Sequence, residues 1–172
     1  ARIDDDYPYS GVIDEIFVKE VYKSDFANKI VIDVGAYRGE SSIYFAINGA
    51  KRVIALEPDE ENYELALMNV KENALENKIV MLNKALAPNE GFISFYKYYN
   101  STHASSIDPN NMVKSNNSKL IVKRVEAMTL NQVIKIAGEE RIGLLKLDCE
   151  GCEYSVLNSF SDFEMIDNII ME

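Results

Sequence analysis

Acidic side chains and glycines stand together at the ends of three apolar runs of this sequence. Asp33–Gly39 reads Asp-Val-Gly-Ala-Tyr-Arg-Gly, Glu57 closes a second apolar run, and Asp148–Gly151 follows a third. A carboxylate at the end of a buried strand can accept hydrogen bonds from both hydroxyls of a ribose, and glycine lets the backbone approach a ligand closely. The three stretches therefore predict a site for a cofactor that contains a nucleoside.

The apolar runs have the composition of strands that are buried on both faces of a parallel sheet. Right-handed crossovers between such strands place helices on both faces of the sheet, and ligands bind beyond the carboxyl ends of the strands. We therefore predict an α/β fold with a doubly wound, Rossmann-like sheet. The expected strands are 30–34, 52–57, 79–82, 142–148 and 166–172, and the expected helices are 11–23, 40–48, 60–74, 129–138 and 152–159.

The alternation of strand and helix is interrupted by two strands of another kind. Gly91–Tyr98 alternates apolar and polar residues as a half-buried antiparallel strand does, and Leu120–Val125 is a second strand. Residues 99–119 between them are rich in Asn and Ser and predict a loop. The expected division of the chain is a single domain over residues 1–172, with a helical segment at 1–28 and an inserted strand pair with its loop at 91–125.

Composition excludes several classes of partner. The chain has 172 residues and a formal net charge of −10, which argues against a nucleic-acid footprint and against an anionic membrane surface. No apolar stretch reaches transmembrane length, and the N-terminus does not resemble a signal peptide. Two cysteines are too few for a disulfide scaffold. We therefore expect a cytoplasmic domain that binds neither nucleic acid nor membrane.

The first turn argues against a nicotinamide dinucleotide. The motif Gly-x-Gly-x-x-Gly would need glycines where the chain has Tyr37 and Glu40, and Glu40 would repel a pyrophosphate at the start of a helix. Asp33 suits a cationic ligand instead, and S-adenosylmethionine carries an ammonium, a sulfonium and a ribose. The simpler alternative is that Gly35 and Gly39 only permit tight packing of the strand against the helix.

Together the three stretches resemble the FkbM-type methyltransferases, which are class I S-adenosylmethionine-dependent enzymes and often O-methyltransferases. Leu145–Glu153 matches the Lys-x-Asp-x-Glu-Gly-x-Glu signature of that family, and it follows Asp33–Gly39 and Ile54–Pro58 in the expected order. The resemblance covers roughly residues 30–172. It implies a fold of class I methyltransferase type and S-adenosylmethionine as the cofactor.

The resemblance also implies which residues contact the cofactor. Glu57 would take the ribose hydroxyls, Asn83–Ala85 would lie beside the adenine, and Asp148 would lie next to the reacting methyl group. The chain departs from the family at Tyr37 and Arg38, where Asn and a small apolar residue are common. The complete implied set is Asp33, Gly35, Ala36, Gly39, Ser41, Glu57, Asn83, Lys84, Ala85 and Asp148.

Candidate catalytic residues are few. Methyl transfer to oxygen requires alignment of the acceptor with the methyl group and removal of the hydroxyl proton, so Asp148 and Glu150 are candidates to orient the cofactor and the acceptor. His103 is the sole histidine and titrates near neutral pH, although a solvated loop histidine is the simpler interpretation. Glu153 falls in a first helical turn, where favourable placement at the positive helix end accounts for it. No required metal is expected.

Cys149 and Cys152 form a Cys-x-x-Cys motif with three interpretations. They are a redox pair, half of a zinc site, or two small residues that fill the variable positions of the family signature. We favour the third interpretation. A local, reversible disulfide is an alternative that would perturb Glu150.

The sequence therefore predicts an S-adenosylmethionine-dependent O-methyltransferase that acts on a small-molecule or sugar hydroxyl. The alternatives are a nicotinamide-binding oxidoreductase domain and a non-catalytic cofactor-binding or redox module that uses Cys149 and Cys152. A complete class I sheet has seven strands, and no sequence follows Glu172 for strands six and seven. We expect either a fragment or a homo-oligomer in which a second copy covers the exposed edge of strand five.

Overall fold

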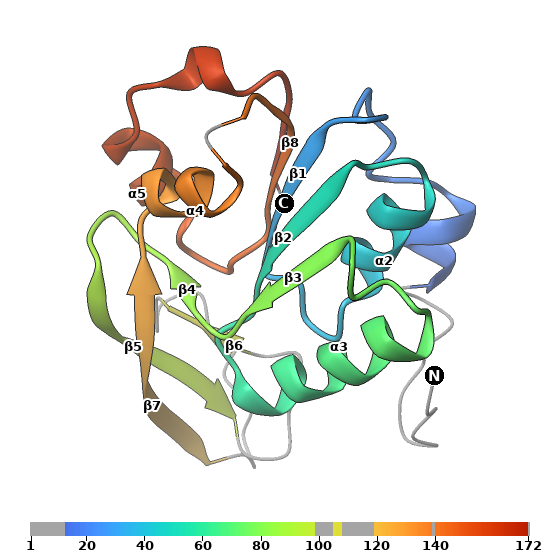
Figure 1. Ribbon diagram of the computed structural model, residues 1–172. Coiled ribbons are helices and arrows are strands. Elements are labelled where there is room, and N and C mark those ends of the chain that lie inside the picture. The colour runs from blue at the N-terminus through green and yellow to red at the C-terminus, as the bar shows by residue number, and fades with distance from the viewer. Residues whose placement is uncertain (1–12, 99–104, 108–118, 139, 172) are drawn as a thin grey trace.

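The computed structural model describes residues 13–98, 105–107, 119–138 and 140–171 (Figure 1). In these residues the central sheet is parallel, with the strand order β3-β2-β1-β8-β9. This arrangement confirms the predicted doubly wound α/β class. The strands are β1 (Ile30–Val34), β2 (Arg52–Leu56), β3 (Ile79–Leu82), β8 (Ile142–Leu147) and β9 (Ile169–Met171).

Helices cover both faces of the central sheet (Figure 1). Side chains alternate along a strand, so Val31 of β1 joins one hydrophobic core with α2 and α3, while Ile32 joins another with α4 and α5. No helix in the described parts of the chain is long and apolar enough to cross a membrane. The helices are α2 (Glu40–Ile47), α3 (Glu60–Glu72), α4 (Leu130–Ile136) and α5 (Glu153–Ser159).

A second sheet lies beside the carboxyl ends of β2 and β3 (Figure 1). Its long antiparallel strands confirm the predicted inserted pair, but the pair belongs to a larger sheet with the order β4-β7-β5-β6. The sequence did not predict β4 and β6, because strands of two residues leave no periodic pattern. The strands are β4 (Ala85–Leu86), β5 (Gly91–Tyr98), β6 (Ser105–Ser106) and β7 (Leu120–Met128).

The second sheet is tied to the central fold by a buried ion pair. Lys97 Nζ of β5 lies 2.5 Å from Oδ2 of Asp59, and both side chains are almost fully buried. Asp59 is the N-cap of α3, where its other carboxylate oxygen accepts the N–H of Glu61 at 3.1 Å. The ion pair therefore fixes the second sheet to the start of α3.

The predicted helix at 11–23 is wrong in its extent. Within the described residues of this segment, Ile13 and the π-helix η1 (Asp14–Val18) are helical, and residues 11 and 12 lie outside the description. Glu20 has a φ of +51°, which no right-handed helix accommodates. Tyr22 instead packs against Phe45 of α2, with ring centroids 6.0 Å apart. Ile16 and Tyr22 of this segment are buried in the core, Ile16 from η1 and Tyr22 from a turn, whereas Ile13 and Val21 are exposed.

The last strand is shorter than predicted. β9 pairs with β8 only over residues 169–171, and Ile166 makes a single bridge to Ile142. Between α5 and β9 the chain forms the short 3₁₀-helix η3 (Phe163–Met165). Glu172 lies outside the described residues.

Gly35 marks the point where β1 meets the end of β8. Its φ is +73°, and a Cβ atom built on it would overlap the carbonyl oxygen of Asp148. The N–H of Asp148 donates to the carbonyl of Val34 at 3.2 Å, so the two chain segments are in direct backbone contact. This close approach between strands requires the glycine whether or not a ligand is bound.

Substitution of Gly35 tests this requirement against a matched glycine. Gly138 also has a positive φ, of +92°, but no heavy atom of the described residues lies within 4 Å of the position that a Cβ atom would take there. Gly138→Ala should lower the free energy of unfolding by about 1–2 kcal/mol, the cost of the left-handed backbone alone. Gly35→Ala should lower it by about 3 kcal/mol or more, because overlap adds to that cost. Urea denaturation of both variants measures the difference, and equal losses would contradict the close approach.

Candidate functional site

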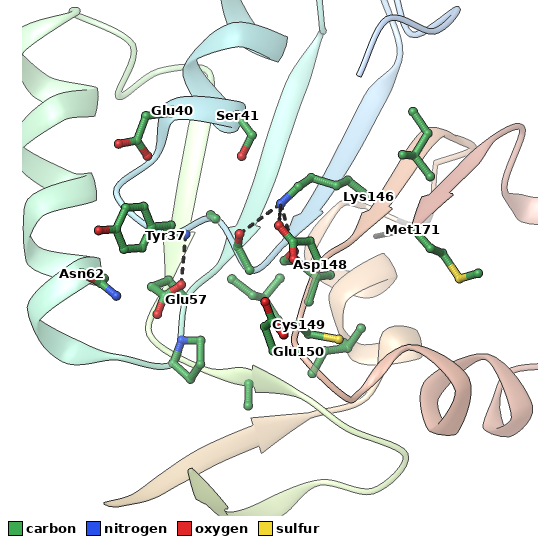
Figure 2. A pocket seen from close by; sticks show the side chains of 18 of the residues that line it. Tyr37, Glu40, Ser41, Glu57, Asn62, Lys146, Asp148, Cys149, Glu150 and Met171 are labelled. Carbon is green, nitrogen blue, oxygen red and sulfur yellow. Dashed lines mark hydrogen bonds and ion pairs between the residues drawn. The ribbon is translucent and has the colours of Figure 1, made fainter. Parts of the chain in front are cut away.

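The carboxyl ends of β1, β2 and β8 open into a cavity of about 560 Å³ that the second sheet also lines (Figure 2). This volume is typical of a small-molecule site. Of the sequence-predicted residues, the cavity is lined by Gly35, Ala36, Ser41, Glu57, Lys84, Ala85, Asp148 and Glu150. Asp33, Gly39 and Asn83 are not among the lining residues, and His103 lies outside the described residues.

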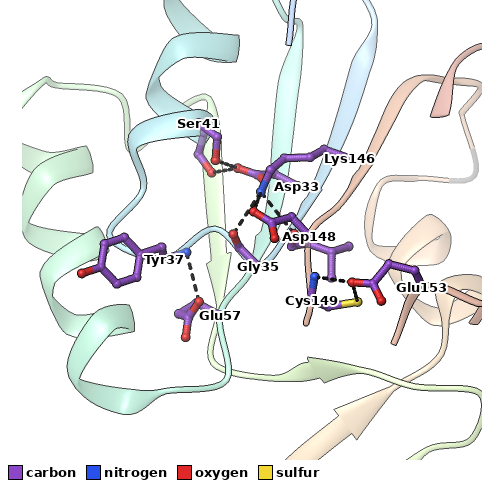
Figure 3. Close-up of polar contacts among 11 residues, drawn as sticks. Asp33, Gly35, Tyr37, Ser41, Glu57, Lys146, Asp148, Cys149 and Glu153 are labelled. Atoms are coloured by element: carbon purple, nitrogen blue, oxygen red, sulfur yellow. Dashed lines mark hydrogen bonds and ion pairs between the residues drawn. The ribbon is translucent and has the colours of Figure 1, made fainter. Parts of the chain in front are cut away.

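Glu57 is held rigidly at the end of β2. Its Oε2 accepts the backbone N–H of Tyr37 at 3.0 Å (Figure 3). Its Oε1 accepts that of Asp59 at 2.9 Å. The side chain is 5% exposed. Burial raises the pKa of Glu57 to about 8, although the two backbone N–H groups lower it. Each carboxylate oxygen retains one lone pair for a further donor from the cavity.

Tyr37 shapes the turn that donates to Glu57. It has a φ of +50°, a left-handed backbone that is uncommon for a bulky residue. The Arg38 guanidinium lies 5.1 Å from the centroid of the Tyr37 ring. The turn therefore keeps its N–H directed at Glu57 although a tyrosine occupies it.

Asp33 lies behind the cavity wall, and its side chain is inaccessible to solvent. Its Oδ2 accepts hydrogen bonds from Ser41 Oγ at 2.7 Å and Ser42 Oγ at 2.6 Å, and its Oδ1 lies 3.1 Å from Lys146 Nζ (Figure 3). These contacts join the start of α2 to the centre of the sheet. The charge of Asp33 is therefore already balanced by a residue of the chain itself.

Lys146 is the functional-site residue to which the sequence analysis gave no role. It stands directly opposite Asp33 in the β1–β8 ladder and is 2% exposed. Its Nζ donates to the carbonyl oxygens of Val34 at 3.3 Å and Gly35 at 3.0 Å, and lies 3.4 Å from Asp148 Oδ2. A charged residue inside an otherwise apolar strand was the available signal, because such a residue is almost never buried without partners.

The ionisation of Lys146 follows from its neighbours. Burial lowers the pKa of Lys146, but the carboxylates of Asp33 and Asp148 raise it by more, so the net shift is upward. The three side chains together carry one excess negative charge. Because Asp148 is the member with an exposed side chain, at 29%, that charge faces the cavity.

Glu150 lies on a tight turn after β8. Its φ is +53°, and its carbonyl accepts a hydrogen bond from the hydroxyl of Ser106 in β6. The chain is therefore no longer extended here, and strand alternation does not decide where Glu150 points. Asp148 and Glu150 nevertheless both line the cavity.

The turn is closed by Glu153 and by a disulfide. Glu153 Oε1 accepts the N–H of Cys149 at 2.9 Å, and Oε2 accepts the N–H of Gly151 at 3.0 Å. Cys149 and Cys152 are joined by a disulfide bond. The structure thus shows the alternative of a local disulfide and gives Glu153 a structural role in holding the turn.

The described residues contain no cluster of three or more His, Cys, Asp or Glu side chains arranged to hold a metal.

The remaining predicted contacts surround the end of β3. Asn83 Nδ2 donates to the carbonyl of Glu57 at 2.9 Å and so braces β2 from outside the cavity. Lys84 pairs with Glu126 of β7, and Ala85 begins β4. Gly39, with a φ of +89°, is the N-cap of α2 and packs against Ala66 of α3.

The parallel sheet, the cavity at its carboxyl edge and the carboxylate that ends β2 define a doubly wound, Rossmann-like fold. Residues 33–171 match the family model described as Methyltransferase FkbM domain. The chain belongs to this family.

Individual relatives agree with the fold. The AMB antimetabolite synthetase AmbE of Pseudomonas aeruginosa is 28% identical over an alignment of 196 positions. The alignment covers 94% of this chain and 9% of AmbE. The methyltransferase FkbM of Methylobacillus flagellatus KT superposes with a TM-score of 0.52 at 18% identity, over 83% of this chain and 31% of that one. The precorrin 8w decarboxylase of Methanobacterium thermoautotrophicum has a TM-score of 0.52 at 14% identity, over 91% of this chain and 61% of that protein. The chain thus spans less than a third of the first two relatives.

Removal of the charge of Lys146 should be strongly destabilising. Lys146→Met leaves Asp33 buried without its counter-charge, which should lower the free energy of unfolding by about 3–5 kcal/mol. The double variant Asp33→Asn/Lys146→Met should recover most of that loss. As a control, Lys51→Met removes an exposed ion pair with Glu140 and should cost less than about 1 kcal/mol. Denaturant titration of the wild type, these three variants and Asp33→Asn decides, and a double variant as unstable as the sum of its two single variants would contradict a coupled pair.

Glu57 should make stability depend on pH. Its pKa of about 8 in the folded protein exceeds the ordinary value of 4.5, so the folded state binds the proton more tightly than the unfolded state. The free energy of unfolding should therefore fall as pH rises from about 4.5 through about 8. Thermal melts between these limits should show a shallower fall for Glu57→Gln than for the wild type. Parallel curves for the two proteins would contradict the raised pKa.

Proposed function

We propose that this domain binds S-adenosylmethionine in the cavity and transfers its methyl group to the oxygen of a hydroxyl on a small-molecule or sugar acceptor. S-adenosylmethionine, when bound, supplies a methyl group on a cationic sulfur. The observation that carries the proposal is the carboxylate of Glu57 at the end of β2.

Glu57 is suited to a vicinal diol. The backbone N–H groups of Tyr37 and Asp59 fix its two oxygens, and one lone pair of each oxygen remains for a hydroxyl donor. A pair of ribose hydroxyls would also stabilise the ionised carboxylate, which burial disfavours. Binding of such a ligand is therefore expected to release a proton near neutral pH.

The charges of the cavity favour a cationic ligand. The excess negative charge of the Asp33, Lys146 and Asp148 group lies at Asp148, and Glu40 at the start of α2 adds a second carboxylate to the lining. Burial raises the pKa of Glu40, so a neighbouring cation would also favour its ionised form. These carboxylates would repel a pyrophosphate, which argues against a nicotinamide dinucleotide.

The turn after β8 is the proposed place of the acceptor. Asp148 and Glu150 line the cavity there together with Ile170 and Met171 of β9, so carboxylates and apolar side chains adjoin. A carboxylate in this position can orient the acceptor hydroxyl and accept its proton. We assign these roles to Asp148 and Glu150.

Calorimetry of the purified domain tests the cofactor. S-adenosylhomocysteine should bind and NADH should not. The carboxylates of the site can bind a diol and a cation, whereas they would repel the pyrophosphate of NADH. Glu57→Ala should weaken S-adenosylhomocysteine binding at least about tenfold, the effect of losing two charge-assisted hydrogen bonds. Glu64→Ala, an exposed position of α3, is the matched control and should bind as the wild type does.

Binding of NADH in place of S-adenosylhomocysteine would refute the proposal and favour the oxidoreductase alternative. Once binding is established, transfer of a labelled methyl group to a panel of sugar, lipid and polyketide hydroxyls identifies the acceptor. Asp148→Asn, measured with the acceptor found in this way, separates loss of turnover from loss of binding.

A further inference from the structure

We propose that the Cys149–Cys152 disulfide is a thiol–disulfide exchange site that opens into the cofactor cavity, and that its redox state sets the affinity of the cavity for S-adenosylmethionine. The second half of this inference rests on the function proposed above. The reaction partner of the exchange site is a dithiol reductant.

The two sulfur atoms have different surroundings. Cys152 is fully buried and belongs to the hydrophobic core that contains Leu147 of β8 and Val156 of α5. Cys149 is partly exposed and lines the cavity. One end of the disulfide is therefore anchored in the core, while the other is accessible from the site.

Reduction separates the two sulfur atoms. Two bonded sulfur atoms lie about 2.0 Å apart, whereas two unbonded heavy atoms need about 3.5 Å or more. Because the core holds Cys152 in place, the displacement falls on Cys149. Its chain neighbours are Asp148 and Glu150, which both line the cavity, so we expect the displacement to reach the carboxylates proposed to face the cofactor and the acceptor.

The turn is also held in a backbone conformation that can relax once the covalent bond is broken. Glu150 has a φ of +53° and Gly151 a φ of +120°. A left-handed backbone at a residue other than glycine costs about 1–2 kcal/mol. The disulfide and the two hydrogen bonds of Glu153 maintain this conformation in the structure.

Reduction also changes the hydrogen bonds of Glu153. Cys149 Sγ lies 3.1 Å from Glu153 Oε1, the same oxygen that accepts the Cys149 N–H. A thiol at Cys149 can donate to this oxygen, whereas a disulfide sulfur cannot. The reduced turn therefore has a hydrogen bond available to Glu153 that the oxidised turn lacks, so the contacts of Glu153 differ between the two redox states.

We place the first attack at Cys149, the half of the disulfide that is partly exposed and lines the cavity. A thiolate of the dithiol attacks Cys149 Sγ, the disulfide bond breaks, and Cys152 leaves as a thiolate that takes a proton from water. The second thiol of the reductant then attacks the mixed disulfide, frees Cys149 as a thiol and closes the reductant's own disulfide. Two electrons pass from the dithiol to the protein. Attack on Cys152 is excluded by its burial.

The first experiment compares S-adenosylhomocysteine binding by the oxidised and the dithiothreitol-reduced domain, with the redox state checked by intact mass. We expect the reduced domain to bind at least fivefold more weakly, because its turn is no longer fixed. Cys149→Ser/Cys152→Ser should bind like the reduced domain and should not respond to dithiothreitol. Equal dissociation constants in the two redox states, or a dithiothreitol effect that persists in the double variant, would overturn the coupling.

A second experiment tests the exchange site without a cofactor. In Cys152→Ser the remaining Cys149 thiol should react with iodoacetamide at least tenfold faster than the Cys152 thiol in Cys149→Ser. Equal rates would overturn the assignment of Cys149 as the accessible sulfur. If S-adenosylhomocysteine binds in neither redox state, the proposed function fails, while these two rates still decide the exchange site.

Discussion

The ion pair between Lys146 and Asp33 is the interaction on which the rest of the site depends. It joins β1 to β8 at the centre of the sheet, and its hydrogen-bonding partners extend from the start of α2 to the carbonyls of the Gly35 turn. Two opposite charges in a solvent-free interior are stable only together, because each balances the desolvation of the other. The pair therefore fixes the positions of three segments that all end at the cavity.

The same pair decides which carboxylate is available to a ligand. An acidic residue in the first strand suggests a partner for a cofactor cation, but Asp33 is occupied by Lys146, Ser41 and Ser42. The surplus charge of the group lies one strand away, at Asp148. Under the proposed function, recognition of the cofactor's cation would be a property of the whole group and not of Asp33 alone.

Strands and helices of the central sheet could be predicted because their apolar runs and caps are local patterns. The partner of Asp33 could not, since Lys146 is distant in the chain and only the β1–β8 register brings the two residues opposite each other. Likewise Gly35 suggested close approach of a ligand. The group that leaves no room for a side chain at this position is instead the carbonyl of Asp148. The segment around Tyr22 has helical spacing, yet its contact with Phe45 comes from turns, because burial of an aromatic ring does not depend on the backbone that delivers it.

The ion pair that ties the second sheet to α3 has a consequence for exchanging parts between relatives. Asp59 receives Lys97 of the insertion on its side chain, while its backbone N–H holds Glu57. Lys123 of β7 also lies 3.5 Å from Asp59 Oδ1. A graft that replaces the insertion without cations at the positions of Lys97 and Lys123 would leave Asp59 as a buried, unbalanced charge one hydrogen bond away from the cavity carboxylate. The insertion is consequently not a detachable module, and a chimaera must transplant both ends of this contact.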